Sequence, residues 1–371
     1  MASSNLLPFF IRNNLTAIDR TSCINFACDL FPNARVTPLE FQGYCSYGLL
    51  VTSDLAPGDH KSSTADAIVQ FRPHCYALDV QIAKAAKIAY GSYAPTVIDL
   101  GHILLERCRS RERTSLLVYQ MDRIPGLPYR HLQVRSRKLD VVAFEKQERL
   151  VRDFSNFLAL GWKEGSAAQA SDISRSCTGK VGSCIAAKLS KLSMELPSLS
   201  LRHRARRAML DLHKLKYLPV VLSHGDVVPS NIMVDEATGR LRGLVDWAEA
   251  EYLPFGFCLY GLDHLLGYTS TPPRSDEEGT RTTWTYYDHA DALRTAFWDE
   301  LEKNIPTITL DDRVREAVEL ARDVGVLLWH GFAWDDGAID RVINEKEDAV
   351  EMECLDVFLG CGGSVDTRAR T

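Results

Sequence analysis

The sequence predicts an α+β fold in which a small sheet with one inserted helix precedes a larger, mainly helical region. In the first third of the chain, short runs rich in β-branched and aromatic residues alternate with turn residues, as strands do. After residue 129 the apolar residues recur at helical spacing. The 371 residues are enough for two domains, each with its own core.

Three runs are expected to be the strands of the sheet: residues 36–53, 66–72 and 114–121. Residues 78–91, between the second and third runs, are rich in alanine at helical spacing and end at Gly91, which predicts a helix. The segment DRIPGLPY that follows contains proline and glycine and is typical of a connector. We therefore expect two lobes, residues 1–124 and residues 125–371.

The second lobe is expected to begin with a long helix over residues 140–160. Its apolar residues lie at steps of seven, three and four, and Asp140 is suited to cap the first turn. A polar loop at residues 163–180 and a basic helix at residues 201–216 follow. The arginines of that helix form either a solvated surface or a phosphate-binding face. The last hundred residues look mainly helical, with an acidic interruption at residues 270–280.

Composition limits the classes of partner. A net charge of -6 argues against a general nucleic-acid binder, and no apolar run approaches the roughly 20 residues that span a bilayer. The ten cysteines show neither metal-site nor CxxC spacing, and the first residues lack the pattern of a secretory signal. We expect a cytoplasmic protein that acts on a small molecule, with no nucleic-acid or membrane partner. Its oligomeric state is left open.

The most informative stretch is LSHGDVVPSNIMVD, followed after a short gap by GLVDW. Residues 220–222 predict a buried strand that leads into a loop with His224 and Asp226. Residues 232–234 and 241–245 predict a hairpin around the turn DEATGR. If residue 232 pairs with 245 and 234 with 243, Asn231 lies opposite Asp246 at the open end of the hairpin, close to Asp226.

Oxygen-bearing side chains at the end of a hairpin suit Mg²⁺, which takes few protein ligands and leaves positions for phosphate oxygens and water. A further carboxylate nearby can accept the proton of a hydroxyl group. This combination predicts phosphoryl transfer, in which the protein mainly positions groups and neutralises charge. In the alternative interpretation Asp226 is a turn former and Asp246 a helix cap, without a shared task.

HGDVVPSN followed by VDW resembles the catalytic and metal-binding segments of the aminoglycoside phosphotransferase and choline kinase group. Together with QGYCSYG, VQFR and YQMDRIPG, these segments are most similar to fungal members. The resemblance implies a protein-kinase-like fold with a small antiparallel-sheet N-lobe, which would bind the nucleotide, and a larger, mainly helical C-lobe for catalysis. It also implies ATP- and Mg²⁺-dependent phosphorylation of a hydroxyl on an amino alcohol, an aminoglycoside-like compound or a secondary metabolite.

The resemblance also implies a role for each residue of the motif. Asp226 would be the catalytic base or would anchor the acceptor hydroxyl, and His224 would brace its loop. Asn231 and Asp246 would bind Mg²⁺, and Asp246 would meet the nucleotide phosphates through the metal.

The third strand departs from the pattern of that group, because residues 67–73 contain no lysine. Arg72 is the nearest cation, and Gln70 shares its strand face since side chains alternate. Arginine keeps the charge and can grip phosphate with two hydrogen bonds. Asp79 or Gln81 would then replace the helix glutamate. In the alternative, Arg72 ends an edge strand and points into water.

The expected phosphate loop, QGYCSYG, contains Gly43 and Gly48, with Ser46 and backbone N–H groups available to approach phosphate. A plain hairpin turn would explain the same residues. Because the strand lysine is missing, a second function stays open. In it, the protein uses a kinase-like scaffold for ligand binding or for chemistry other than phosphotransfer, in secondary metabolism.

The acceptor is expected in the helical lobe, where aromatic residues and carboxylates occur together. Asp263, Trp329 and Asp335 are candidates, because aromatic faces beside carboxylates can hold an amine or a quaternary ammonium. In the alternative, Trp329 belongs to the core, His330 is a structural histidine with satisfied hydrogen bonds, and Asp335 ends a helix.

Overall fold

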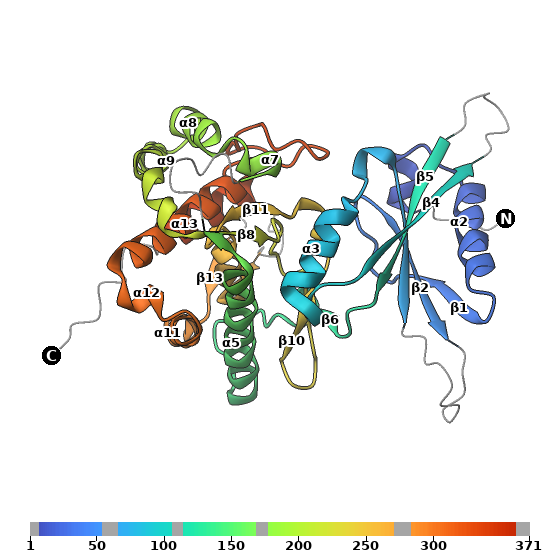
Figure 1. Cartoon of the computed structure of the whole chain (residues 1–371), viewed down its shortest axis with the longest axis horizontal. Helices are drawn as coiled ribbons and strands as arrows, with labels where there is room; N and C mark the ends of the chain where they lie inside the picture. Colours follow the sequence, from blue (N-terminus) through green and yellow to red (C-terminus); the bar gives the residue numbers. More distant parts are fainter. Residues whose placement is uncertain (1–6, 54–65, 106–113, 168–176, 271–282, 361–371) are drawn as a thin grey trace, which may run out of the picture. The chain divides into compact units, whose positions relative to one another are not determined.

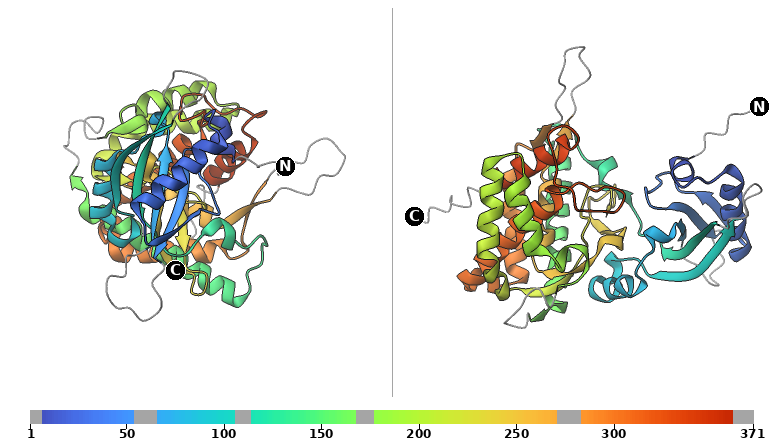
Figure 2. Two further views of the ribbon diagram at one scale, coloured as in Figure 1. Left: turned by 90° about the vertical axis from the view of Figure 1, so that its right-hand side faces the viewer. Right: turned by 90° about the horizontal axis from the view of Figure 1, so that it is seen from above.

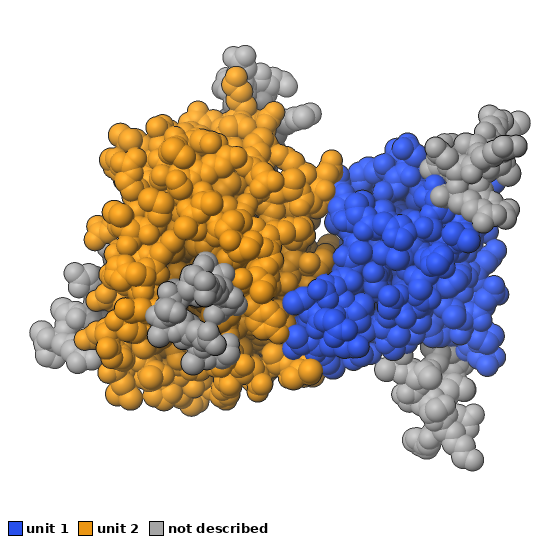
Figure 3. Space-filling view, turned by 45° about the horizontal axis from the view of Figure 1, so that its top comes forward, with its two compact units in different colours: residues 1–87, 94–124 blue, residues 88–93, 125–371 orange. Residues whose placement is uncertain are grey.

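The computed structural model describes residues 7–53, 66–105, 114–167, 177–270 and 283–360. The chain forms two compact units (Figure 3): unit 1 is Met1–Lys87 with Ala94–Ile124, and unit 2 is Ile88–Tyr93 with Pro125–Thr371. Unit 1 holds a small antiparallel sheet and unit 2 is larger and mainly helical. This is the arrangement that the resemblance implies, so the predicted fold class is confirmed. No helix in the described ranges is both long and apolar enough to cross a membrane.

The sheet of unit 1 has five strands in the order β1-β2-β3-β5-β4, and every neighbouring pair is antiparallel. The predicted run 36–53 contains most of β1, a connecting loop and β2, and the runs 66–72 and 114–121 correspond to β3 and β5, whereas β4 was not predicted. A bulge between Asp99 and His102 and the positive φ of Gly101 interrupt its pattern. The strands are β1 (Ala34–Pro38), β2 (Tyr47–Ser53), β3 (Ala67–Arg72), β4 (Val97–Leu105) and β5 (Thr114–Asp122).

Helices cover both faces of this sheet, with α2 on one side and α3 on the other (Figures 1 and 2). Phe71 of the sheet packs in one buried cluster with Phe10 and Cys23. On the other face Ala83 packs against Tyr119. The helices are α1 (Pro8–Arg12), α2 (Ala17–Leu30), the 3₁₀ turn η1 (His74–Tyr76) and α3 (Val80–Tyr90), whose last turn belongs to unit 2.

The helix predicted over residues 140–160 is α5 (Val141–Glu164), and Asp140 caps it by accepting the Ala143 N–H at 2.8 Å. The basic helix is α9 (Leu199–Asp211), extended by the 3₁₀ turn η3 (Leu212–Tyr217). The other helices are α4 (Tyr129–Leu132), α7 (Gly179–Gly182), α8 (Ile185–Glu195), α10 (Tyr260–Leu265), α11 (Ala290–Asn304), α12 (Thr307–Leu310), α13 (Asp312–His330) and α14 (Ala349–Gly360), with 3₁₀ turns η2 (Gly91–Tyr93), η4 (Trp247–Glu249) and η5 (Phe257–Leu259).

Unit 2 also contains three small sheets, with orders β11-β8-β7, β10-β9-β6 and β12-β13. Residues 168–176 of the predicted loop and nearly all of the interruption at 270–280 lie outside the described residues, and the rest of that loop contains the end of α5, β7 and the start of α7. The strands are β6 (Leu127–Pro128), β7 (Ser166–Ala167), β8 (Pro219–Ser223), β9 (Ile232–Val234), β10 (Leu241–Leu244), β11 (Glu251–Pro254), β12 (Gly267–Ser270) and β13 (Thr283–Tyr286).

The predicted β9–β10 hairpin exists, but its predicted register is wrong. Ile232 pairs with Leu244, and the Val245 N–H donates to the Asn231 carbonyl at 2.9 Å, so Asn231 lies opposite Val245 and not opposite Asp246. The cause is a bulge between Leu241 and Gly243. A symmetric pairing cannot anticipate a bulge, because it adds a residue to one strand only.

Asp153 of α5 anchors the hairpin. Its carboxylate accepts the buried Leu241 N–H at 3.1 Å and an Arg240 guanidinium N–H at 2.9 Å, and its side chain is only 5% exposed. The long helix therefore holds the strand that leads to Asp246.

Replacing Asp153 by alanine should lower the free energy of unfolding by about 1–3 kcal/mol, because a buried N–H loses its acceptor. Urea denaturation measures this. Glu148→Ala is the matched control, since Glu148 on the same helix forms a more exposed pair with Arg152. We expect it to cost less than about 0.5 kcal/mol. Equal losses in the two variants would contradict the anchoring role.

Candidate functional site

The loop after β8 turns sharply at Gly225, which has a φ of 77°. A Cβ atom there would lie 2.0 Å from the Glu249 carbonyl oxygen, so only glycine lets the loop pass so close to η4. In the sequence HGD, the glycine thus brings His224 and Asp226, two candidate site residues, against the segment after Asp246.

His224 joins the loop to the hairpin. Its Nε2 donates to the Val245 carbonyl at 3.0 Å, and its Nδ1 accepts the Asp226 N–H at 3.2 Å. Because a carbonyl only accepts and an amide N–H only donates, the ring is neutral with its proton on Nε2. Burial lowers the pKa of His224 to about 4, although the negative charge of Asp246 acts in the opposite direction. The low pKa keeps the ring neutral at ordinary pH.

Asp226 is half-buried in an acidic environment. Burial raises its pKa to about 7, and the charges of Asp246 and Glu249 add to the rise. Asn231 opposes it, since its side-chain amide donates to Asp226 Oδ2 at 2.7 Å. A carboxylate with a pKa near neutrality can take up and release a proton under ordinary conditions.

Asp246 follows β10 in a left-handed conformation, with φ and ψ both 63°. Non-glycine residues seldom adopt this region, and aspartate and asparagine do so most readily. The turn redirects the chain immediately after the bulged strand. Its carboxylate lies close enough to raise the pKa of Asp226 although Asn231 and Asp246 are not cross-strand partners.

The donor set fits a divalent cation. The Asn231 amide donates through Nδ2 to Asp226, and no described residue donates a hydrogen bond to its Oδ1. An amide oxygen beside the repelling carboxylates of Asp226 and Asp246 is the hard-oxygen environment that Mg²⁺ prefers. Within the described ranges, no group of three His, Cys, Asp or Glu side chains is arranged as a metal site. A site made by Asn231 and Asp246 uses an amide oxygen instead and needs water or phosphate to complete it.

Sequence reasoning missed two residues beside the loop of Asp226: Tyr260, which holds the loop, and Glu249, which adds charge. The Tyr260 hydroxyl accepts the Val227 N–H at 2.9 Å, and Trp329 stacks on the Tyr260 ring at a centroid distance of 5.2 Å and an interplanar angle of 7°. Glu249, three residues after Asp246, pairs with Lys180 at 3.1 Å and adds negative charge beside Asp226. Its acidic character was visible in the sequence, whereas Tyr260 gave no signal.

Arg72 lies on β3, the middle strand of the unit 1 sheet, and is only 3% exposed. The alternative that it ends an edge strand and points into water is therefore wrong. Its Nε donates to Gln70 Oε1 at 3.0 Å and its Nη1 donates to the Tyr76 carbonyl at 3.3 Å. Asp79, one of the two candidates to replace the helix glutamate, caps α3 by accepting the Gln81 N–H at 2.8 Å.

The QGYCSYG loop connects β1 to β2 in unit 1. The Gln42 side chain accepts the Gly48 N–H at 2.8 Å and donates to the Gly48 carbonyl at 2.9 Å, which ties the two ends of the loop together. Ser46 is 5% exposed, and a Cβ atom on Gly43 would lie 3.3 Å from its hydroxyl oxygen. Ser46 thus lies beneath the loop, so the backbone is the better candidate to approach a phosphate.

Of the predicted acceptor residues, the two carboxylates already have cationic partners. Asp263 pairs with Arg322 at 2.7 Å, and Asp335 accepts two hydrogen bonds from Arg341, at 2.9 and 3.1 Å. Trp329 is half-buried and stacks on Tyr260, whose hydroxyl accepts the Val227 N–H. The structure therefore brings Trp329, but neither of the two carboxylates, to the loop of Asp226.

His264 and His330 form a buried pair in the same part of unit 2, with ring centroids 5.4 Å apart. Both rings contact Phe358, and in the described part of the chain neither Nε2 has a hydrogen-bond partner. The interpretation of His330 as a satisfied structural histidine is therefore wrong at this atom. Burial lowers the pKa of His264 to about 4. Burial also lowers the pKa of His330 well below its usual value, and the neighbouring His264 lowers it further.

The part of the chain that contains the candidate site matches a known protein family. Residues 183–257, which include His224, Asp226, Asn231 and Asp246, match the phosphotransferase enzyme family. An aminoglycoside phosphotransferase from Streptomyces rimosus is similar at 13% identity over 83% of this chain and 98% of its own, with a TM-score of 0.41. A choline kinase from Streptococcus pneumoniae is similar at 12% identity over 83% and 88%, with a TM-score of 0.40. A search of curated proteins finds no match.

The buried histidine pair should make stability depend on pH. Below pH 6.5 the unfolded histidines bind protons, whereas folded His264 stays neutral until about pH 4. The free energy of unfolding should therefore fall as pH falls from about 6.5 to 4, by up to about 1.4 kcal/mol per pH unit for each histidine. Chemical denaturation across this range should show a smaller slope for His330→Phe. The exposed control, His203→Gln, should keep the full slope; a slope unchanged in His330→Phe would contradict this assignment.

Proposed function

We propose that the protein transfers the γ-phosphoryl group of ATP to a hydroxyl of a small molecule. The observation that carries the proposal is the grouping of Asp226, Asn231 and Asp246: an amide of Asn231 holds the Asp226 carboxylate, and the charge of Asp246 raises its pKa. The match to a phosphotransferase family over residues 183–257 supports it independently, because that segment contains all three.

In the proposed reaction, Asp226 orients the acceptor hydroxyl and takes its proton. The acceptor oxygen forms a bond to the γ-phosphorus as the bond to the β-phosphate oxygen breaks, and ADP leaves. His224 holds the position of Asp226 through the backbone N–H at 3.2 Å. Since the pKa of Asp226 is raised to about 7, the residue is basic enough to accept this proton without holding it permanently.

Asn231 and Asp246 would hold Mg²⁺. The bound ion would neutralise negative charge on the nucleotide phosphates. The Asn231 amide oxygen has no hydrogen-bond donor among the described residues and lies beside the two carboxylates, which supports this assignment. The carboxylates of Asp226, Asp246 and Glu249 also favour an acceptor that carries positive charge, such as an amino alcohol or an aminoglycoside-like compound, with Trp329 as an aromatic surface.

A second function is favoured by the contacts of Arg72. Its guanidinium is buried and donates to Gln70 and to the Tyr76 carbonyl, so it would have to release one of them to grip a phosphate with both arms. In this second candidate the chain binds a ligand, or acts on it, without using ATP. Nucleotide binding distinguishes the two functions.

Asp226→Asn should lower turnover about 10²- to 10⁴-fold, the usual contribution of a general base. The change removes the basic carboxylate but keeps its shape, so stabilisation by ATP with Mg²⁺ should stay close to that of the unchanged protein. Steady-state phosphorylation of a panel of amino alcohols and aminoglycosides, together with thermal unfolding, measures both quantities. Full turnover in this variant would refute the role of Asp226.

ATP and Mg²⁺ together, but neither alone, should raise the Tm. A ligand at 100 times its dissociation constant adds about 2.7 kcal/mol to stability. Asp246→Gly should abolish the rise in Tm that ATP and Mg²⁺ produce together. Because glycine accepts the left-handed backbone at this position, the lost shift reports on the carboxylate and not on backbone strain. Asp235→Asn, at the turn of the same hairpin, is the control and should keep the shift. No shift with ATP in the unchanged protein would favour the second function.

A further inference from the structure

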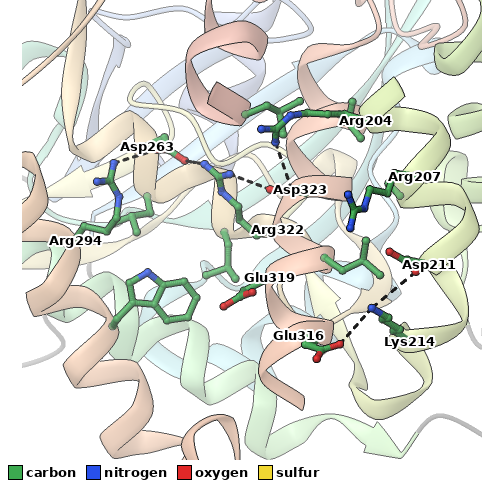
Figure 4. Close-up of a pocket in the computed structure, with 17 residues that line it drawn as sticks. Arg204, Arg207, Asp211, Lys214, Asp263, Arg294, Glu316, Glu319, Arg322 and Asp323 are labelled. Carbon is green, nitrogen blue, oxygen red and sulfur yellow. Dashed lines mark hydrogen bonds and ion pairs between the residues drawn. The ribbon is translucent and has the colours of Figure 1, made fainter. Parts of the chain in front are cut away.

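A pocket of about 690 Å³ lies within unit 2 between α9, α11 and α13 (Figure 4). Its volume is in the range of small-molecule sites, roughly 300–1,000 Å³. None of its lining residues belongs to the loop or the hairpin that carries Asp226 and Asp246. The pocket is therefore distinct from the proposed phosphotransfer site.

Most of the charged side chains in the wall neutralise one another. Arg322 pairs with Asp263 at 2.7 Å and with Asp323 at 3.0 Å, and the pair with Asp263 links α13 to α10. The remaining pairs are Arg204 with Asp323, Lys214 with Asp211 and Glu316, and Arg294 with Asp263 and Asp291. These pairs satisfy four of the five cations that line the pocket.

Arg207 is the fifth cation, and it forms no ion pair or hydrogen bond with any residue in the described ranges. Glu319, on α13 across the pocket from α9 in Figure 4, is likewise without an ion pair or hydrogen bond in that part of the chain. Burial raises the pKa of Glu319, and Asp323 and Glu316 add to the rise against Arg315. The pocket thus presents one cation and one anion on facing helices, both exposed to solvent and neither in an ion pair or hydrogen bond with a described residue.

Apolar side chains also line the pocket. Trp298 of α11 is half-buried at the pocket. Five leucines also line it: Leu259, Leu262, Leu320, Leu327 and Leu359. Such a surface favours the burial of a hydrocarbon or aromatic body.

We propose that this pocket binds a small zwitterion whose anionic head, a carboxylate or a phosphate monoester, meets Arg207 and whose ammonium group meets Glu319. The apolar body joining the two heads lies against the leucines and Trp298. Arginine binds either anion through two parallel hydrogen bonds, and the ammonium compensates a carboxylate that is partly removed from water. The site requires no nucleotide, so it stands apart from the proposed phosphotransfer.

Isothermal titration calorimetry of the full chain without nucleotide tests the proposal. The probes are aminohexanoate with its shorter and longer homologues, aminohexyl phosphate, and the singly charged hexanoate and hexylamine. At least one zwitterion should bind about tenfold more tightly than both singly charged compounds. The comparison of the carboxylate with the phosphate identifies which anionic head is preferred, and either preference agrees with the proposal.

Matched variants assign each head. Arg207→Gln should remove the advantage of the zwitterion over hexylamine, and Glu319→Gln should remove its advantage over hexanoate. Arg206→Gln is the control, because Arg206 is exposed on α9 as Arg207 is but does not line the pocket, and it should leave binding unchanged. The proposal is overturned if Arg206→Gln weakens binding as much as Arg207→Gln, or if zwitterions bind no better than singly charged probes. Absence of binding by every probe at about 10 mM would also overturn it, since millimolar ligands are detected there.

Discussion

The neutral ring of His224 holds the candidate site together. One nitrogen donates to the carbonyl of Val245 and the other accepts the N–H of Asp226, so the ring sets the distance between the end of the hairpin and the loop of Asp226. A protonated ring would have a donor on both nitrogens, and Nδ1 would then oppose the Asp226 N–H. Burial, by keeping the ring neutral, preserves the geometry on which the Asp226, Asn231 and Asp246 grouping depends.

The sequence was sufficient for the local elements of this site. The apolar run before His224, the turn at 235–240 and the apolar run before Asp246 each have a direct signal, and the loop and hairpin exist where they were expected. The register was not accessible, because the bulge comes from packing. Asp153 of α5 binds the Leu241 N–H, and Gly243 passes so close to the backbone of Tyr93 that a Cβ atom would lie 2.6 Å from its carbonyl oxygen. Both partners are distant in sequence, so no local pattern records them.

In unit 1 as well, local sequence patterns predicted some elements and missed others. Strands β2 and β3 were predicted, but α2, which packs on their sheet, was not, because its apolar side chains do not form one stripe: Ile18 is 70% exposed whereas Cys23 is fully buried. The Thr16 and Asp19 capping box was a signal that could have found it. The contacts of Arg72 could not be inferred, because one acceptor is the backbone carbonyl of Tyr76 and any residue type would supply it.

The stack of Trp329 on Tyr260 gives the loop of Asp226 an intrinsic fluorescent reporter. The Tyr260 hydroxyl holds the Val227 N–H, so a movement of the loop changes the position of the tyrosine ring beneath the indole. Indole emission depends on the polarity and the contacts around the ring. The intrinsic fluorescence of this tryptophan should therefore change when the loop of Asp226 moves, without any attached label.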